Sequence, residues 1–326
     1  MIYLFIDSSG FGGIESHILQ FALLIKQQNR NVEVLFVEHY PDHPLYQRLC
    51  TNKIKYRFLS DTAPSLFFSL LLPSDVVHAH GYKASLLSRF YRLRYSFRAI
   101  TSFHAGEKLS GKLASYEYLN RITSFLSYNF AVSSRIKRTV PFRCHLLNNF
   151  IMQLPVFKMR SKHQVLQVGF VGRLSHEKGI DRFIELSDLL TGCQFHIFGD
   201  GDEQSQLIAK KNIHWYGAVD SMDEHWSLID VLVISSRAEG LPMAALEAMA
   251  HGVPVIATNV GDLSKLVASD WIVEESDWKR LSILIDKLDA YDNIAWRALS
   301  KDSYAKIIDN FSGESRWEQI EKAYQL

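Results

Sequence analysis

The sequence predicts an α/β protein of two domains, each built from a parallel sheet that is covered by helices. Apolar, β-branched runs alternate with amphipathic stretches in both halves of the chain, which is typical of strands joined by helical crossovers. The 326 residues are too many for one ordinary core and suit two, at roughly 150 residues per domain. With 47% hydrophobic and 22% charged residues, each half can bury a core.

The first domain is predicted to span residues 1–155. It opens with a strand, a helix and a strand, at Ile2–Asp7, Ile14–Gln28 and Val32–Val37. Further strands are expected in four short apolar runs: Asp75–Ala79, Ala99–Phe103, Phe130–Val132 and His145–Leu147. The polar, irregular segment Met152–His163 is expected to link the two domains.

The second domain is predicted to span residues 156–311 and repeats the alternation. Its expected elements are a strand at Val165–Val171, a helix at Gly179–Leu190, a strand at Gln194–Phe198, a helix at Asp202–Ala209, and strands near His214, Val231 and Val255. Residues 312–326 predict an amphipathic helix, because Trp317, Ile320 and Tyr324 share one face. We expect this helix to pack back on the first domain.

Cysteine content and the N-terminus exclude several classes. Cys50, Cys144 and Cys193 are far apart and odd in number, which fits neither a disulfide framework nor a zinc site of paired cysteines. The N-terminus has no basic region ahead of its apolar stretch, and the longest apolar run, Leu66–Leu72, is far below the ~20 residues of a membrane span. We expect a cytoplasmic protein whose membrane contacts are peripheral.

Charge is divided unevenly between the halves. Residues 1–155 hold 18 Lys and Arg against 9 Asp and Glu, whereas the remaining residues hold 18 against 26. The segment 82–98 has five basic residues and no acid, interleaved with aromatic residues: Lys83, Arg89, Arg92, Arg94 and Arg98, with Tyr82, Phe90, Tyr91, Tyr95 and Phe97.

Such a segment suits an anionic, partly apolar surface, and the inner face of the cytoplasmic membrane is the expected partner. The competing interpretation is that these aromatic rings fill the core beneath a basic helix. No nucleic-acid partner is expected, because no DNA- or RNA-binding motif accompanies the cations.

Two glycine-rich loops lie between a strand and a helix. In Gly10-Phe11-Gly12-Gly13, the glycines would let backbone amides approach an anion at a helix N-terminus. A plain tight turn explains this loop about as well, and the incomplete glycine fingerprint argues against a nicotinamide enzyme. The second loop, Phe198-Gly199-Asp200-Gly201-Asp202, lies where ligands bind in open α/β sheets, but turn chemistry alone also explains it.

Charged residues follow two other predicted strands. Arg173 and Lys178 lie five residues apart on a strand-to-helix loop and can converge on one diphosphate, or can be two solvated cations. Glu239 precedes a helix expected to start near Pro242 and can hold a sugar hydroxyl. Glu247 is expected to be buried in that alanine-rich helix, where ribose hydroxyls or a neighbouring cation would be its partner.

The pattern Gly-Arg-Leu-x-x-Glu-Lys-Gly at 172–179, followed by Glu239-Gly-Leu-Pro and Glu247-Ala-Met-Ala, resembles the retaining family-4 glycosyltransferases of GT-B fold (glycosyl transferases group 1). Weaker similarity covers most of the chain, in the glycine loop at 10–13, Val77-His78-Ala79-His80, Thr101-x-x-His104, Ala131-Val132-Ser133-Ser134 and Asn148-Asn149. The resemblance implies two Rossmann-like domains that face a central cleft.

The resemblance also implies roles for individual residues. Arg173 and Lys178 would bind the donor diphosphate, Glu247 the ribose, and Glu239 the donor sugar together with the amides of Gly240 and Leu241. His104 would lie near the transferred sugar and the acceptor, although it can also simply end a buried strand. Glu239, His104, Arg173 and Lys178 are the expected catalytic residues. The other residues expected to line the donor site are Gly12, Gly13, Gly172, Gly199, and Tyr216 to Val219, whose backbone would meet the base.

The histidine pattern and one departure complete the comparison with the family. His78 and His80 are interpreted as structural, because no further ligand has convincing spacing for a metal, and no metal site is expected. The chain reads Gly261-Asp262-Leu263-Ser264-Lys265 where the family usually has two glycines and then a glutamate, which puts the local donor contacts in doubt.

The resemblance therefore implies a metal-independent, retaining transfer of a sugar from a nucleotide-sugar co-substrate, without a cofactor, to a saccharide or lipid-linked acceptor. Synthesis of a bacterial-type surface polysaccharide or lipopolysaccharide is the expected setting. A sugar-nucleotide epimerase of the same architecture is disfavoured by the basic first domain, because it needs no acceptor. A non-catalytic sugar-nucleotide-binding subunit is disfavoured because Arg173, Lys178, Glu239 and Glu247 are all present.

Overall fold

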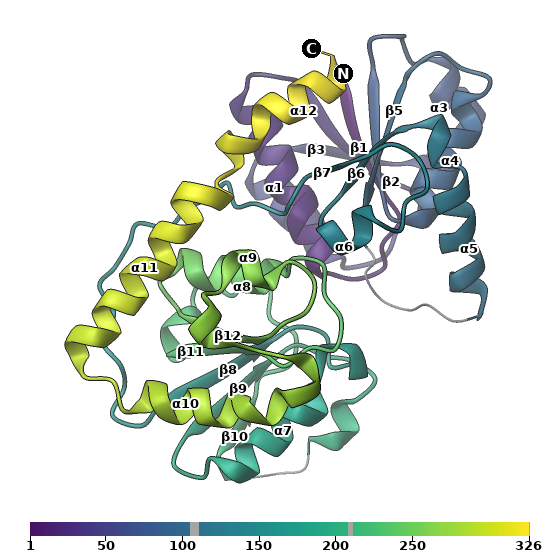
Figure 1. Cartoon of the computed structure of the whole chain (residues 1–326). Coiled ribbons are helices and arrows are strands. Elements are labelled where there is room, and N and C mark those ends of the chain that lie inside the picture. The colour runs from purple at the N-terminus through teal and green to yellow at the C-terminus, as the bar shows by residue number, and fades with distance from the viewer. Residues whose placement is uncertain (105–110, 208–210, 326) are drawn as a thin grey trace. The chain divides into compact units, whose positions relative to one another are not determined.

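A computed structural model describes residues 1–104, 111–207 and 211–325 (Figure 1). The chain forms two compact units. Unit 1 comprises Met1–Met152 together with Gly313–Leu326, and unit 2 comprises Gln153–Ser312. The division falls after residue 152, against 155 in the sequence prediction, and the return to unit 1 falls after residue 312, against 311.

Unit 1 contains a seven-stranded sheet in the order β3-β2-β1-β4-β5-β6-β7, with every pair parallel. Its strands are β1 (Ile2–Ile6), β2 (Val32–Phe36), β3 (Lys55–Phe58), β4 (Val76–His80), β5 (Arg98–Phe103), β6 (Tyr128–Ala131) and β7 (Cys144–Leu146). Strand β3 was not predicted. Its four residues alternate between exposed and half-buried at the sheet edge, so their sequence lacks a continuous apolar run.

Helices cover both faces of this sheet. They are α1 (Gly13–Gln27), α2 (Pro44–Thr51), α3 (Pro64–Ser69), α4 (Tyr82–Arg92), α5 (Gly111–Ile122), α6 (Ser134–Lys137) and α12 (Trp317–Tyr324). On β1, Leu4 points to a core shared with α1, α2 and α12, while Phe5 points to a second core shared with α3 and α4. This alternation of buried side chains is what a parallel sheet between two helical layers requires.

Helix α12 completes unit 1 from the far end of the sequence. Ile320 and Tyr324 are fully buried in the core with α1 and β1, and Trp317 packs against that core. The hydroxyl of Tyr324 lies 2.7 Å from Nδ1 of His78 on β4. The apolar face predicted from the sequence is therefore the face that this helix buries.

Unit 2 contains a six-stranded sheet in the order β10-β9-β8-β11-β12-β13, again with parallel pairs. Its strands are β8 (Gln167–Val171), β9 (Gln194–Phe198), β10 (Ile213–Trp215), β11 (Val231–Ile234), β12 (Val255–Thr258) and β13 (Ile272–Val273). Its helices are α7 (Ile180–Leu189), α8 (Met243–Ala250), α9 (Leu263–Leu266), α10 (Leu281–Asp289) and α11 (Asn293–Phe311). The long helix α11 packs against α8.

The helix predicted at 202–209 was wrong for the described part of that segment. Residues 202–207 hold only a 3₁₀ turn, Gln204–Gln206, and residues 208–210 lie outside the described residues. The amide of Glu203 donates to the carbonyl of Leu174, and a Cβ on Gly201 would lie 2.3 Å from that same oxygen. These contacts pack the segment against the loop after β8, which contains Leu174, and the segment does not form an α-helix.

Among the described residues, no helix is long and apolar enough to cross a membrane. Both sheets share one topological property: the strand order reverses direction beside the first strand, between β1 and β4 in unit 1 and between β8 and β11 in unit 2. Ligands of open α/β sheets bind at the carboxyl ends of strands at such a switch point.

Candidate active site

The switch point of unit 2 brings together the two loops that carry its charged motifs. Strands β8 and β11 are neighbours, and the loop after β8 holds Arg173 and Lys178, while the loop after β11 holds Glu239. Carboxyl ends of parallel strands meet at one edge of a sheet. Residues that are 61 positions apart in the sequence therefore meet.

Lys178 and Glu239 form an ion pair in which the ammonium contacts both carboxylate oxygens. The Lys178 ammonium lies 2.8 Å from Oε1 and 2.7 Å from Oε2 of Glu239. The Glu239 side chain is only 6% exposed, whereas that of Lys178 is 26% exposed. The Ser236 hydroxyl also donates to Oε1 of Glu239, at 2.8 Å. An ammonium has three N–H donors, so one remains for a bound anion after two have met the carboxylate.

A second ion pair fixes the loop after β11 to helix α7. The Arg237 guanidinium donates to both carboxylate oxygens of Asp181, at 2.7 and 2.6 Å, and to the carbonyl of His176 at 2.7 Å. Burial favours a raised pKa for Asp181, but the hydrogen bonds and charge of Arg237 outweigh it, and the pKa of Asp181 is lowered. The Asp181 carboxylate therefore stays ionised and links helix α7 to the loop after β11.

Gly179 allows the close approach of these loops. Its φ is +70°, and a Cβ at this position would lie 2.2 Å from the carbonyl oxygen of Ser235. The Ser235 hydroxyl donates to the carbonyl of Gly179 at 2.8 Å. Only glycine fits this backbone conformation and this distance, which explains the last glycine of the 172–179 motif.

Arg173 is exposed on the same loop as Lys178. The loop rests on the turn after β9, because a Cβ on Gly199 (φ +136°) would lie 2.0 Å from the carbonyl oxygen of Gly172. The pKa of Glu177 is lowered, chiefly by a hydrogen bond from its own backbone amide and further by the Ser175 side chain, against an opposing effect of burial. Glu177 is thus part of the loop structure, and Arg173 is its outward-facing cation.

Tyr216 offers an aromatic surface beside this edge of the sheet. Its ring stacks on Phe198 with centroids 4.4 Å apart, and its hydroxyl lies 2.9 Å from Nδ1 of His196. The side chain is 41% exposed, and Val219 is partly buried further along the same loop. The sequence assigned only backbone contacts to this loop, whereas the structure also presents the ring of Tyr216.

Glu247 is partly exposed, not buried as its alanine-rich surroundings predicted. Helix α8 begins at Met243 with Pro242 as its N-cap, so Glu247 lies in the second turn. Gly240 and Leu241 precede the helix, and Leu241 is buried. Glu247 is therefore not enclosed by the apolar residues of its helix.

The departure from the family pattern at Gly261 supports the Glu239 loop. The φ of Gly261 is +62°, and a Cβ there would lie 2.2 Å from the carbonyl oxygen of Gly240. The amide of Asp262 donates to that same carbonyl at 2.8 Å. The segment that departs from the pattern thus packs directly on the loop expected to hold the donor sugar.

The glycine loop of unit 1 is occupied by one of its own side chains. The Gly12 amide donates to Oε2 of Glu15 at 2.7 Å, and Glu15 is 6% exposed. A carboxylate at this helix N-terminus repels an incoming phosphate and takes one of its amides. Gly12 is thus the cap of helix α1, and Gly13 is its first residue, while the role of both in donor binding stays a prediction.

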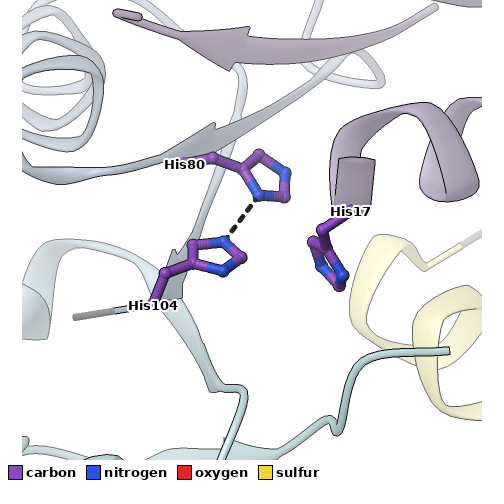
Figure 2. Close-up of side chains that lie close together, drawn as sticks. All are labelled: His17, His80 and His104. Atoms are coloured by element: carbon purple, nitrogen blue, oxygen red, sulfur yellow. Dashed lines mark hydrogen bonds between the residues drawn. The ribbon is translucent and has the colours of Figure 1, made fainter. Parts of the chain in front are cut away.

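Four histidines lie close together in unit 1. His104 follows β5, and its Nε2 is 3.0 Å from Nδ1 of His80 at the end of β4 (Figure 2). His17 of α1 points toward both rings, with centroids 5.7 Å from His80 and 5.0 Å from His104. His78 bonds instead to Tyr324 and to the Ser102 hydroxyl, as a structural residue would.

Sequence reasoning missed His17 and treated His80 as structural, because the cluster joins a helix to two strands that only the sheet order places side by side. Burial lowers the pKa of His78 and of His104 to about 3, with the His104 charge also disfavouring protonation of His78. Burial is also the main reason that the pKa values of His17 and His80 lie well below the ordinary range. All four imidazoles are therefore neutral at pH 7.

The basic segment 82–98 is mostly not a free surface, which corrects the interpretation of it as a five-cation docking face. Arg89 is 1% exposed and donates to the carbonyl and side chain of Asn120 and to Thr123 and Ser127. Lys83 pairs with Asp7 and Glu38, and Arg98 donates to the carbonyl oxygens of Tyr324 and Gln325.

Some aromatic residues of that segment are packed in the core, and Phe90 is exposed. Phe97 is buried, and Tyr91 stacks on Phe68 with centroids 4.4 Å apart. Arg92 and Arg94 are exposed, and beside them Phe90 and Leu93 are 66% and 69% exposed. The exposed basic and apolar side chains of the segment are these four residues around the end of α4.

The two parallel-sheet units have the architecture of the GT-B fold of glycosyltransferases, and cations and carboxylates gather at the switch point of the second. Residues 166–289 match the model of the family described as glycosyl transferases group 1. The matched segment contains Lys178, Glu239 and Glu247. The resemblance recognised in the sequence is thereby confirmed for this segment of the chain, residues 166–289.

Curated relatives and solved structures agree with this assignment. The chain is 25% identical over 253 residues to the O-antigen biosynthesis glycosyltransferase WbnH of Escherichia coli, covering 72% of this chain and 73% of that protein. It is 29% identical over 182 residues to the lipopolysaccharide core biosynthesis mannosyltransferase LpsB of Rhizobium meliloti, covering 48% and 51%. Its fold is similar to that of Anabaena Alr3699/HepE in complex with UDP-glucose (TM-score 0.82, 16% identity, 99% of both chains) and of TarM (TM-score 0.85, 10% identity, 100% of this chain and 98% of that chain).

Proposed function

We propose that this glycosyltransferase transfers a sugar from a nucleoside-diphosphate sugar with retention of anomeric configuration. The observation that carries the proposal is the Lys178–Glu239 pair at the switch point of unit 2. The ammonium has one N–H left for a diphosphate oxygen, and the carboxylate can accept from a sugar hydroxyl. Arg173, on the same loop, supplies a second cation for the diphosphate.

The proposed donor is a UDP-sugar, and the proposed acceptor is a saccharide or a lipid-linked saccharide of a bacterial surface polysaccharide. The donor is supported by the likeness of the fold to HepE, whose structure holds UDP-glucose. The acceptor is supported by relatives named for O-antigen and lipopolysaccharide core synthesis. The exposed ring of Tyr216 is proposed to lie against the base, and Glu247 to accept from the ribose hydroxyls.

The proposed reaction breaks the bond between the anomeric carbon and the diphosphate oxygen and forms a bond from that carbon to the acceptor oxygen. The acceptor hydroxyl approaches on the face of the departing diphosphate, which takes the hydroxyl proton, so the configuration is retained. Charge builds up on the diphosphate as it leaves, and Lys178 and Arg173 stabilise that charge more strongly in the transition state than in the ground state.

His104 is proposed to hydrogen-bond a hydroxyl of the transferred sugar or of the acceptor. Its pKa of about 3 keeps the ring neutral at pH 7, so it can both donate and accept a hydrogen bond. The reaction is proposed to need no divalent ion at the diphosphate, because two side-chain cations take that role.

The place of action is proposed to be the cytoplasmic face of an anionic membrane, reached through Phe90, Arg92, Leu93 and Arg94. Two exposed cations contribute about 2 kcal/mol near an anionic leaflet, and the two exposed apolar side chains add to this. The test is flotation with liposomes of graded anionic content, comparing the wild type with a variant that carries Arg92→Ala and Arg94→Ala. Binding that ignores lipid charge, salt and the double change would refute this location.

The main experiment is a thermal-shift screen of UDP-, GDP- and ADP-sugars, followed by a transfer assay with the best donor. A ligand at 100 times its dissociation constant adds about 2.7 kcal/mol of stability. In a unit of this size that raises the melting temperature by roughly 5–10 °C. Lys178→Ala should remove at least about half of this shift, whereas the control Lys162→Ala, whose ammonium pairs with Asp289 at 3.0 Å, should keep it.

The transfer assay separates the alternatives. Release of nucleoside diphosphate only with an acceptor present, and an NMR coupling constant showing the donor's anomeric configuration in the product, would support the proposal. Epimerised donor without released diphosphate would indicate an epimerase. A shift with no turnover would indicate a binding subunit, and no shift with any sugar nucleotide would refute the proposal.

A further inference from the structure

The three rings of His17, His80 and His104 form a set of potential metal ligands. Helix α1, the end of β4 and the residue after β5 each supply one ring (Figure 2). One ring nitrogen from each histidine lies within 4.8 Å of the corresponding atom of the other two. Of these three residues, only His104 has a place in the proposed transfer reaction.

Three nitrogen atoms of this cluster lack a hydrogen-bond partner within the part of the chain that the structure describes. His17 is completely buried, and neither of its ring nitrogens has a hydrogen bond there. Nε2 of His80 is unpaired as well, although it is Nδ1 of that ring that faces His104. Leaving a buried polar group unpaired is costly, so an imidazole without a hydrogen-bond partner indicates a water molecule or an ion.

The surroundings of His17 do not otherwise call for a histidine. Its ring lies edge-on to Phe21 and Phe150, with centroids 4.9 and 5.7 Å away. A phenylalanine would pack among these rings without an unpaired nitrogen. The polar ring in an aromatic environment is therefore the feature that a ligand would explain.

The chemistry of the cluster selects the kind of ion. It offers three nitrogens and, among the residues described, no carboxylate or thiolate, which disfavours Mg²⁺ and Ca²⁺ and suits Zn²⁺ and its first-row neighbours. Zinc–nitrogen bonds of about 2.0–2.1 Å at tetrahedral angles place the nitrogens roughly 3.3 Å apart. The 3.0 Å between Nδ1 of His80 and Nε2 of His104 is near that value. The nitrogen of His17 lies within 4.8 Å of a nitrogen of each of the other two rings, so a small movement of His17 toward them would complete the geometry.

We propose that unit 1 binds one first-row transition-metal ion, with Zn²⁺ the best fit, through His17, His80 and His104. Three protein ligands leave a fourth tetrahedral position for water or another ligand. Binding exchanges the hydrogen bond between His80 and His104 for two metal–nitrogen bonds. The ion thereby fixes the orientation of the His104 ring.

The test is a titration of the full chain, stripped with a chelator and dialysed, with Co²⁺ and then with Zn²⁺. We expect one Co²⁺ per chain with the visible absorption of a tetrahedral complex, displacement of Co²⁺ by Zn²⁺, and a higher melting temperature with one equivalent of Zn²⁺. His17→Phe should weaken binding at least about tenfold, since it removes one of three ligands while filling the same space. His39→Gln, which changes an exposed histidine of unit 1, should bind like the wild type.

A wild type that takes up neither ion, or only many ions weakly, would overturn the proposal whatever the variants do. Equal affinity in the wild type and His17→Phe would overturn it as well. If His17→Phe does not fold, His80→Phe takes its place beside the wild-type titration. These readouts do not involve sugar transfer, so they stand or fall separately from the proposed enzyme activity.

Discussion

Replacing Lys178 with alanine should affect both the stability of unit 2 and its affinity for the donor. The Glu239 carboxylate is 6% exposed, and among the described residues it would keep only the Ser236 hydroxyl as a side-chain donor. Breaking a buried pair by removing one partner costs about 3–5 kcal/mol, and exposed pairs are worth about 0–1 kcal/mol. Because Lys178 is 26% exposed, we expect an intermediate loss of about 2–3 kcal/mol.

A double-mutant cycle isolates the contribution of the pair itself. Glu239→Gln keeps an acceptor for Ser236 and leaves Lys178 able to reach water, so its own cost should be about 1 kcal/mol. The double variant should lose less than the sum of the single variants, with a coupling energy of about 1–2 kcal/mol. Urea unfolding followed by tryptophan fluorescence suits this measurement, because five of the six tryptophans lie in unit 2.

Donor binding is measured separately by calorimetry. Loss of one charge-assisted hydrogen bond, about 1.5–3 kcal/mol, should weaken the donor affinity of Lys178→Ala roughly 10- to 150-fold. The control Lys162→Ala should leave donor affinity unchanged. A coupling energy below about 0.3 kcal/mol would show that the ion pair does not form in solution. An unchanged donor affinity in Lys178→Ala would refute its role at the diphosphate.

Four further outcomes are expected. Arg173→Ala should weaken donor binding roughly 10- to 150-fold in calorimetry, without loss of stability, because this side chain is exposed. Glu247→Ala should raise the donor KM and leave kcat nearly unchanged, since a ribose contact persists through the reaction. Transfer should continue in excess chelator. The pKa of His196 is lowered to about 4, first by burial and then by the charges of His214 and His163, while Tyr216 and Gln167 bond its ring. The unfolded chain protonates this group below pH 6.5, so stability should fall by about 3 kcal/mol between pH 6.5 and 4, as measured by urea unfolding.

Controls make these outcomes decisive. Destabilisation by Arg173→Ala would mean that its side chain has a structural role, and a lower kcat with unchanged KM in Glu247→Ala would place that residue at the reacting centre instead of the ribose. Activity lost in chelator and restored by Mg²⁺ or Mn²⁺ would contradict metal-independent chemistry, whereas restoration by Zn²⁺ alone would point to the histidine cluster. His196→Gln should remove its share of the acid sensitivity, and an unchanged pH slope would contradict the low pKa.

The sequence predicted most buried strands and the strand-to-helix loops, because buried parallel strands are continuous apolar runs. It did not predict β3, whose edge position gives alternating exposure, or α11, whose buried face is a narrow stripe containing Trp296, Ser300 and Ile307. The sequence also placed Arg89 on an exposed basic surface, whereas it is buried. A buried arginine cannot be distinguished from an exposed one by composition, because its hydrogen-bond acceptors, here on α5 and in the following turn, come from a distant part of the sequence.

For the candidate site, the sequence identified individual residues but not the contacts between them. The motif residues of unit 2 were identified because each follows a strand, but the contact between Lys178 and Glu239 depends on β8 and β11 being neighbours. The histidine cluster depends likewise on the order of β1, β4 and β5, together with the helix that follows β1. Strand order is a property of tertiary packing, and local spacing does not encode it.

The return of residues 313–326 to unit 1 sets an order of events during synthesis. Unit 2 is continuous in the sequence and has left the ribosome entirely when residue 312 emerges, whereas the N-terminal sheet still lacks Ile320 and Tyr324. The unit that is translated first is therefore the last to be completed. A nonsense mutation just after codon 312 would spare the motif-bearing unit and expose the core of the other one, so such an allele should produce a chain that binds donor but aggregates.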